Sequence, residues 1–283
     1  MLSVLYGLMQ GAYNLKVRHI PLTFPALPSA FDGFRLIHIS DLHTGSFPSV
    51  QPVRDAVQLI NQQEADLVCF TGDLVNYQTS EADPFLEALQ QIQARYGIYA
   101  IRGNHDYGNY KTWPDMEAWQ ANNAAMVSTY QQLGWHLLRN EWRFIRKGDA
   151  SIPVIGVDNW SSLKRFTNYG NLATASENLP ADTFQLLLSH DPTHWSKEVV
   201  HHYPDIDLTL SGHTHGMQMG IDFTRFKASP ARMIYKHWAV LYRKAHQYLY
   251  VNRGLGFFGF PARFGVYPEI TVIELRQGES TWN

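Results

Sequence analysis

The sequence FRLIHISDLH at residues 34–43 decides the fold, because it joins an apolar run to an acidic residue and a histidine. The run Phe34 to Ile39 predicts a β-strand, and Asp41 and His43 follow directly after it. From this stretch onward, short apolar runs alternate with longer helical stretches. That alternation is typical of β-α-β units and a largely parallel sheet, so we predict an α/β protein.

The alternation continues along the chain, with a change of pattern after residue 134. Between residues 135 and 157 the pattern becomes strand-like, and Lys147-Gly148-Asp149 predicts the turn of a hairpin in a second sheet. The further predicted strands are 67–71, 98–102, 135–138, 142–146, 152–157, 184–188, 207–210, 248–251 and 270–275. The predicted helices are 50–63, 84–93, 113–133 and 193–201.

The composition permits a large core and disfavours nucleic acid as a partner. Of 283 residues 45% are hydrophobic, which is enough to bury a substantial core. Lys and Arg number 23 against 25 Asp and Glu, so the formal net charge of −2 supplies no broad basic field for a nucleic-acid backbone. The single cysteine, Cys69, lies in an apolar run and is expected to be a buried small hydrophobic residue.

The N-terminal stretch is apolar and is followed by basic residues. We expect residues 1–30 to form a leader and residues 31–283 to form one domain. Residues 1–13 are too few to span a bilayer, which needs about 20 apolar residues. Two interpretations stay open for them: an element packed on the domain, or an interfacial anchor that could be the remainder of a longer membrane segment. The expected location is the cytoplasm, with peripheral contact at the inner face of a membrane as an extension of the second interpretation.

Polar segments follow five of the predicted strands. The segments are Asp-Leu-His, Gly-Asp, Gly-Asn-His-Asp, Ser-His and Gly-His-Thr-His-Gly. Because loops at the carboxyl ends of parallel strands share one edge of a sheet, we expect these segments to converge. The glycines before the polar residues are expected to permit sharp turns and close approach. The candidate metal ligands in these loops are Asp41, His43, Asp73, Asn104, His190, His213 and His215.

This set of donors predicts two divalent metal ions. Carboxylates, imidazoles and one carboxamide, without a thiolate, suit Mn, Fe or Zn better than Ca. One ion needs roughly four to six donors, so seven side chains are about right for two ions that share a ligand. Two ions about 3.5 to 4 Å apart can clamp the oxygens of a phosphoryl group and activate a water molecule. His105 is then left to protonate the leaving oxygen, and we expect Asp106 to fix its tautomer.

The order of these motifs resembles the calcineurin-like metallophosphoesterase superfamily over residues 34–275. The resemblance implies two β-sheets packed face to face and flanked by helices, in four layers, and a phosphoester as substrate. It assigns His105 as general acid and Asp73 as the bridging ligand. For metal one it implies Asp41, His43, Asp73 and His215. For metal two it implies Asp73, Asn104, His190 and His213.

A narrower resemblance is to a membrane-associated branch that includes bacterial UDP-2,3-diacylglucosamine hydrolases. It rests on the leader, on residues 211–216 followed by Gln218, and on residues 250–256. Met217 departs from this branch, which commonly has a second glycine there. We therefore expect metal binding to be kept and the shape of the pocket to be altered.

The resemblance favours cleavage of a phosphodiester or pyrophosphate bond in a lipid-linked or nucleotide-sugar-lipid substrate. The aromatic and basic segments 221–241 and 257–264 would then form an apolar lid, although simple packing is an equal alternative. A soluble phosphomonoesterase or cyclic-nucleotide phosphodiesterase is the second hypothesis, and a metal-bound interaction scaffold is the third. Arg102 and Arg253 could contact a phosphate, but packing or surface roles are the simpler expectation, and His38 is expected to be structural.

Overall fold

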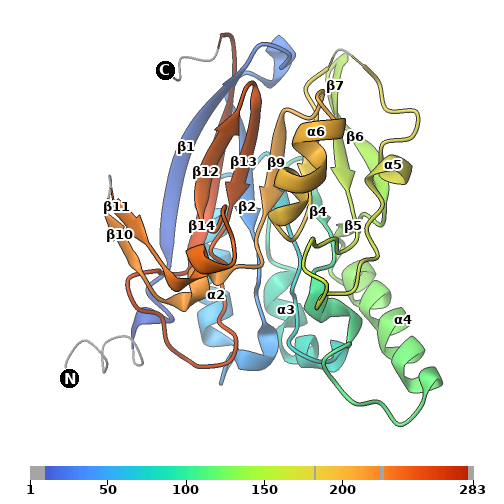
Figure 1. Ribbon diagram of the computed structural model, residues 1–283, viewed down its shortest axis with the longest axis vertical. Coiled ribbons are helices and arrows are strands. Elements are labelled where there is room, and N and C mark those ends of the chain that lie inside the picture. Colours follow the sequence, from blue (N-terminus) through green and yellow to red (C-terminus); the bar gives the residue numbers. More distant parts are fainter. Residues whose placement is uncertain (1–9, 182, 224–225, 280–283) are drawn as a thin grey trace.

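The computed structural model describes residues 10–181, 183–223 and 226–279, and these form two sheets with helices on their outer faces (Figure 1). The strands are β1 (Lys16–Phe24), β2 (Phe34–Ile39), β3 (Leu67–Phe70), β4 (Ile98–Ala100), β5 (His136–Leu137), β6 (Glu141–Lys147), β7 (Ala150–Gly156), β8 (Leu186–Leu188), β9 (Leu208–Ser211), β10 (Ile221–Phe223), β11 (Phe226–Ala228), β12 (Val240–Lys244), β13 (Gln247–Val251) and β14 (Glu269–Gln277). The α-helices are α2 (Gln51–Asn61), α3 (Leu86–Leu89), α4 (Met116–Gln132), α5 (Leu172–Ala175) and α6 (Val200–His202).

The two main sheets have six strands each, with parallel pairs at their centres, and β10 and β11 form a separate two-stranded antiparallel sheet. The first sheet has the order β1-β14-β2-β3-β4-β5, and the second has the order β12-β13-β9-β8-β7-β6. In the first, Leu36 of β2 lies opposite Leu67 of β3; in the second, Leu186 of β8 lies opposite Leu208 of β9. The predicted hairpin is confirmed as β6 and β7, which pair antiparallel across Lys147.

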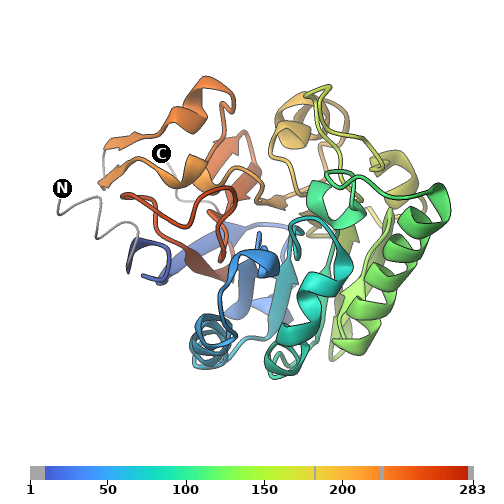
Figure 2. The same cartoon turned by 90° about the horizontal axis from the view of Figure 1, so that it is seen from below.

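Three apolar cores define four layers. The core between the sheets contains Leu36 and Cys69 from the first and Leu210 from the second. Seen from below in Figure 2, α2, α3 and α4 lie side by side on the outer face of the first sheet, where a second core forms. The third core joins the outer face of the second sheet to α5 and to the segment before α6. The predicted four-layer fold is therefore confirmed.

Helix α2 shows how the sequence sets a layer. Its buried residues Val53, Ala56, Val57 and Ile60 recur every three or four positions, so they form one apolar stripe against the first sheet. Pro52 lies in the first turn, where its missing N–H costs no helical hydrogen bond.

The predicted helix at 84–93 is mostly absent as an α-helix. The structure has a 3-10 segment, Thr79–Phe85, followed by the single turn of α3. Pro84 lies within this segment, and because it has no N–H and a fixed φ it disfavours a regular α-helix around it. The prediction at 193–201 is also modified, since a π-helical turn at Trp195–Val199 leads into α6.

The described part of the expected leader belongs to the fold. Strand β1 pairs in parallel with β14 at the edge of the first sheet, with Lys16 opposite Glu269. The folded domain therefore includes residues before the boundary that we expected at residue 30. The expectation for residues 1–13 falls mainly on residues 1–9, which lie outside the described residues. In the part of the chain that is described, no helix is both long and apolar enough to cross a membrane.

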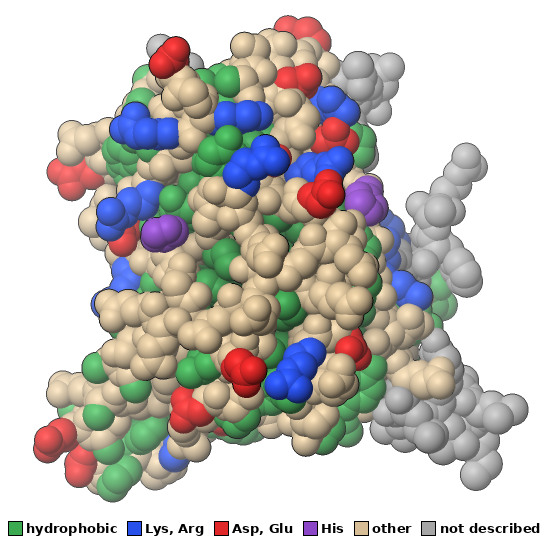
Figure 3. All heavy atoms as spheres, turned by 180° about the vertical axis from the view of Figure 1, so that it is seen from behind, with side chains coloured by type: hydrophobic (Ala, Val, Ile, Leu, Met, Phe, Trp, Pro, Cys, Tyr) green, Lys and Arg blue, Asp and Glu red, His purple; other side chains and the backbone are tan. Residues whose placement is uncertain are grey.

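The face opposite to that of Figure 1 carries charges of both signs. Figure 3 shows Lys and Arg side chains interspersed with Asp and Glu over this surface. Interspersed charges produce no extended positive field. This distribution agrees with the expectation from the net charge.

Candidate metal centre

Five loops converge at the carboxyl ends of strands from both sheets. Three of these loops follow β2, β3 and β4 of the first sheet, and two follow β8 and β9 of the second. The sequence pattern predicted one shared edge, but the structure uses the adjoining edges of two sheets. The site therefore lies where the two sheets meet, and neither sheet could form it alone.

The backbone of these loops is strained at the candidate ligands. Asp41 (φ 50°), Asp73 (φ 58°) and His213 (φ 70°) lie in the left-handed region, which residues with a Cβ atom rarely adopt. His43 and His215 each have φ 48°. Each such residue costs on the order of 1 kcal/mol or more, so their concentration in one place indicates a functional constraint.

Two glycines allow the loops to approach closely. A Cβ atom on Gly103 would lie 2.2 Å from Oδ1 of Asp73, and one on Gly212 would lie 2.1 Å from Oδ2 of Asp41. Both distances are far below van der Waals contact. Glycine is therefore required at these two positions by the carboxylates beside them.

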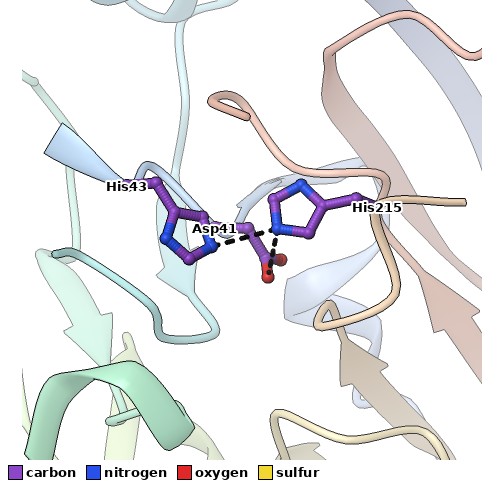
Figure 4. A group of neighbouring side chains, drawn as sticks. All are labelled: Asp41, His43 and His215. Atoms are coloured by element: carbon purple, nitrogen blue, oxygen red, sulfur yellow. Dashed lines mark hydrogen bonds and ion pairs between the residues drawn. The ribbon is translucent and has the colours of Figure 1, made fainter. Parts of the chain in front are cut away.

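The first group of candidate ligands consists of Asp41, His43 and His215, whose ligand atoms all lie within 4.8 Å of one another. Figure 4 shows the two rings and the carboxylate pointing toward one another. The Nε2 atoms of His43 and His215 are 3.0 Å apart, and Nε2 of His215 lies 3.4 Å from Oδ1 of Asp41. All three residues are buried.

The second group consists of Asp73, His190 and His213, again within 4.8 Å. Nε2 of His190 lies 3.1 Å from Oδ2 of Asp73 and 3.2 Å from Nδ1 of His213. The same Oδ2 atom of Asp73 lies 3.6 Å from Nε2 of His43 in the first group. Asp73 thus lies between the two groups, where a bridging carboxylate would be needed.

Asn104 supplies an oxygen that fits a metal ligand. Its Nδ2 donates a hydrogen bond to the hydroxyl of Tyr110 at 2.9 Å. Within the residues that the structure describes, its buried Oδ1 atom has no hydrogen-bond partner. A buried acceptor without a donor is costly, and a cation at this oxygen would satisfy it.

The outward nitrogens of two histidines are held by acceptors. Nδ1 of His43 lies 2.9 Å from Oδ1 of Asn76, and Nδ1 of His190 lies 2.6 Å from the carbonyl oxygen of Thr71. Such acceptors place the proton on Nδ1 and leave Nε2 for a metal, as in known metal sites. No sequence motif indicates Asn76, since its role depends on the path of the loop after β3.

The other two histidines differ in this respect. Nε2 of His213 faces Asp191 at 3.5 Å and the hydroxyl of Tyr235 at 2.8 Å, so Nδ1 is its ligand atom. Asp191 directly follows the predicted ligand His190, so its position in the sequence could have indicated that it lies at the site. Nδ1 of His215 instead lies 3.2 Å from the buried guanidinium of Arg263, which is a donor. Its tautomer is therefore not held by an acceptor.

His105 lies at the site, but Asp106 does not orient it as expected. The carboxylate of Asp106 accepts backbone N–H groups of Asp73 and Gly103, each at 2.9 Å, and so braces two ligand loops. Nδ1 of His105 hydrogen-bonds the carbonyl oxygen of Asn76 at 2.7 Å. The carboxylate is thus turned toward the backbone, and a main-chain carbonyl fixes the tautomer of the imidazole.

The electrostatics of the cluster suit cations. Burial opposes the charge of Asp73, but the neighbouring His190 and His105 outweigh it and hold the pKa of Asp73 well below its ordinary value. Burial likewise opposes the charge of His190, yet Asp73 and Asp41 raise its pKa to about 10. Burial lowers the pKa of His43 to about 3 and that of His213 to about 4, so both rings are neutral ligands at physiological pH.

Metal affinity should therefore rise with pH. Because the pKa of His190 is about 10, this ring carries a proton below that pH and must lose it to bind an ion. Loss of one proton makes the affinity increase about tenfold for each pH unit. Titration of the metal-free protein with Mn²⁺ at several pH values between about 6 and 9 checks this. An affinity that does not change with pH would show that His190 carries no additional proton in the metal-free protein.

Of the other residues that the sequence singled out, Arg102 and His38 make buried contacts, whereas Met217 lines the cavity. Arg102 forms a buried ion pair with Asp158 at 3.1 Å. His38 is buried, with Nε2 2.9 Å from Oγ1 of Thr71, which agrees with its expected structural role. Met217 lines the cavity beside the ligands and has φ 48°, a conformation that glycine adopts without strain.

The cavity over the two groups has a volume of about 680 Å³. Aromatic and apolar side chains share its lining with the polar ones. Phe258 packs against His105 with ring centroids 4.5 Å apart, and Phe166 packs edge-on against His213 at 4.7 Å. The lining includes His43, Asp73, Asn104, His105, His213, His215, Tyr110, Arg165, Phe166, Met217, Met219, Pro230, Tyr235, Phe258 and Phe260.

A four-layer fold with two adjoining ligand groups defines a metallophosphoesterase-type site. The family model described as calcineurin-like phosphoesterase matches residues 34–217, which contain all seven candidate ligands. The chain therefore belongs to the calcineurin-like phosphoesterase family. This family depends on a dinuclear metal centre, and the two groups of ligands fit one.

Related proteins agree with this membership. The uncharacterized metallophosphoesterase YkuE of Bacillus subtilis is 32% identical over 256 residues, covering 88% of this chain and 82% of the relative. A "transmembrane protein with metallophosphoesterase domain" of Danio rerio is 30% identical over 279 residues, covering 96% of this chain, and this chain spans 60% of its length. The phosphodiesterase YaeI of Escherichia coli is 28% identical over 247 residues, covering 86% of this chain and 82% of the relative.

Among solved structures, the sulfate thiohydrolase SoxB of Thermus thermophilus has the same fold. The TM-score is 0.50 at 14% sequence identity, covering 88% of this chain and 57% of the other. A likeness at this identity concerns the fold alone.

Proposed function

We propose that this protein hydrolyses a phosphodiester or pyrophosphate bond in a lipid-linked or nucleotide-sugar-lipid substrate, using two divalent ions of the Mn, Fe or Zn type. The observation that carries the proposal is the single cavity in which candidate metal ligands adjoin an apolar wall. Metal ligands alone would serve any phosphoester. The wall favours a substrate with an apolar portion.

Exposed apolar side chains beside the cavity support a membrane surface as the site of action. Met233 is 89% exposed, and Met219 and Phe260 are exposed while also lining the cavity. Ile221 and Ile234 are exposed next to them in the sequence. Exposed apolar residues near a cavity often mark a contact with a membrane or a partner. We accordingly propose peripheral contact at the inner face of a membrane, with the protein otherwise cytoplasmic.

The ligand groups indicate how the chain would act. Asp41, His43 and His215 would hold one ion, and Asn104, His190 and His213 the other, with Asp73 between them. When bound, the ions supply positive charge to the phosphoryl oxygens and lower the pKa of the attacking water.

His105 is the residue left for proton transfer. The carbonyl of Asn76 holds its Nδ1 atom, so Nε2 is the nitrogen available to the leaving oxygen. Tyr110 and Phe258 each pack against its ring at 4.5 Å and limit the access of bulk water.

The test compares one metal-loaded preparation on three substrates: a long-chain lipid-linked diester in vesicles, its soluble short-chain analogue, and a phosphomonoester. We expect the vesicle substrate to be cleaved fastest. The variant Met233→Gln should weaken vesicle binding by up to about tenfold. Met116→Gln, at an exposed methionine of α4, a helix with no residue in the cavity lining, should have no effect. If the soluble esters are cleaved as fast as the vesicle substrate, the result would support a soluble phosphomonoesterase or cyclic-nucleotide phosphodiesterase. If the protein binds metal but hydrolyses none of the three substrates, the result would support a metal-bound interaction scaffold.

A further inference from the structure

An arginine that the sequence did not single out lines the cavity. Arg102 is buried in an ion pair with Asp158, and Arg253 is buried in an ion pair with Glu269 at 2.6 Å. Neither lines the cavity, whereas Arg165 does, as the one Lys or Arg of the lining among the residues that the structure describes. Arg165 is therefore the side chain through which the protein itself could attract an anion there.

The guanidinium of Arg165 is held close to the second ligand group. Its Nη2 donates to the hydroxyl of Tyr235 at 3.2 Å, and that hydroxyl lies 2.8 Å from Nε2 of His213. The guanidinium also lies over the ring of Phe166, 4.7 Å from its centroid. Arg165 is thus linked to a candidate metal ligand through two hydrogen bonds.

The remaining donors of Arg165 face a cavity rather than a carboxylate. Its side chain is exposed, and a guanidinium carries five N–H groups. Across residues 10–181, 183–223 and 226–279, no Asp or Glu forms an ion pair with it. The positive charge is therefore not neutralised by the protein.

The loop that carries Arg165 is braced at its base. It runs from β7 to α5, and the side chain of Asn159 donates to the carbonyl oxygen of Thr167 at 2.9 Å. The side chain of Asn168 accepts the N–H of Ser161 at 2.6 Å and donates to its carbonyl oxygen at 3.0 Å. Because these bonds close the loop, the backbone that carries the arginine has little conformational freedom left to lose on binding.

We propose that Arg165, positioned by Tyr235 and Phe166, binds a second anionic group of the substrate, a phosphate or a carboxylate carried beyond the phosphoryl group that reacts. This inference rests on the proposed function and adds a charge requirement to it. The metal ions neutralise the reacting group, and the planar guanidinium pairs with an oxyanion through two N–H groups. The cavity would thereby select a substrate that is both partly apolar and doubly anionic.

The test uses three p-nitrophenyl phosphodiesters that differ only in the end of a propyl chain, which is unsubstituted, carboxylated or phosphorylated. The variant is Arg165→Met, which keeps much of the length and removes the charge. We expect its KM for the preferred anionic ester to rise about 10- to 100-fold, with little change in kcat or in either constant for the unsubstituted ester. Comparison of the two anionic esters distinguishes phosphate from carboxylate.

Two further variants sharpen the result. Arg165→Lys should recover part of the lost affinity for the anionic ester, because lysine restores the positive charge but not the planar pair of N–H groups. Lys164→Met, which removes the neighbouring charge outside the cavity lining, should leave all three esters unaffected. An equal loss on all three esters, or a wild-type protein that does not favour either anionic ester, would overturn the proposal.

Binding separates this inference from the proposed function. Pentane-1,5-diylbisphosphonate, an analogue of the bisphosphate product in which CH2 groups replace both ester oxygens so that no ester bond can be hydrolysed, should bind metal-loaded wild type at least about tenfold more tightly than Arg165→Met. If no ester is hydrolysed but this difference is present, the proposed function fails and the anion site stands. If hydrolysis occurs and the two proteins bind equally, the anion site fails alone.

Discussion

Replacing His105 with alanine should lower kcat for an alkyl phosphodiester by about 100- to 10,000-fold while both metal ions stay bound. His105 is absent from both groups of candidate metal ligands, and its Nδ1 bonds a backbone carbonyl 2.7 Å away. Its removal should therefore cost proton transfer and little metal affinity. Steady-state kinetics on protein of known metal content measures the effect.

The leaving group provides the decisive comparison. A p-nitrophenolate departs without needing a proton, so His105→Ala should slow a p-nitrophenyl diester much less than an alkyl diester. His201→Ala, at an exposed histidine of α6, is the matched control and should change neither rate. If His105→Ala slows both esters equally with metal content unchanged, the side chain positions the substrate and transfers no proton.

The candidate ligands could be predicted because their signal is local. Each lies within a few residues of an apolar run, as Asp41 lies after β2 and His213 after β9. A strand that ends in polar residues is visible in the sequence, and parallel pairing then brings such ends together. The structure accordingly brings six of the seven into two groups and leaves the oxygen of Asn104 without a donor.

The residues around the ligands could not be predicted, because their contacts join loops that are far apart in sequence. Arg165 meets Tyr235, 70 residues later, and His43 meets Asn76, 33 residues later. The role expected for Asp106 failed for the same reason. Adjacency to His105 suggested a contact, but in the 3-10 turn Asn104–Tyr107 the carboxylate points back to the backbone of neighbouring loops.

The edge strand β1 was equally hidden, although the edge strands β5 and β6 were predicted. The expected leader contains β1, and its partner β14 lies at the other end of the chain, paired antiparallel with β2. Polar residues alternate with apolar ones in β1, so local pattern alone does not distinguish an edge strand from an amphipathic leader. The pairing is fixed by contacts across the whole chain, and one of these is an ion pair of unusual burial.

Replacing Glu269 with glutamine should lower the free energy of unfolding by about 3 to 5 kcal/mol. Glu269 begins β14 and is fully buried. Its carboxylate lies 2.6 Å from Nη1 of Arg253 and 3.1 Å from Nε of Arg18, and it accepts a hydrogen bond from the hydroxyl of Tyr250 at 2.9 Å. Glutamine keeps the shape but removes the negative charge, so the buried guanidinium of Arg253 would face a neutral amide.

A surface pair offers the matched control. Arg35 and Glu64 are also 3.1 Å apart, but their side chains are 49% and 81% exposed, so water screens their charges. Glu64→Gln should therefore change the free energy of unfolding by less than about 1 kcal/mol. Denaturant unfolding of both variants in metal-free protein makes the comparison, because bound metal would add its own stabilisation. If Glu269→Gln costs no more than Glu64→Gln, the fold does not depend on the buried charge. A large cost that the double variant Arg253→Met/Glu269→Leu partly reverses would show that the uncompensated cation, and not the loss of packing, is what destabilises the protein.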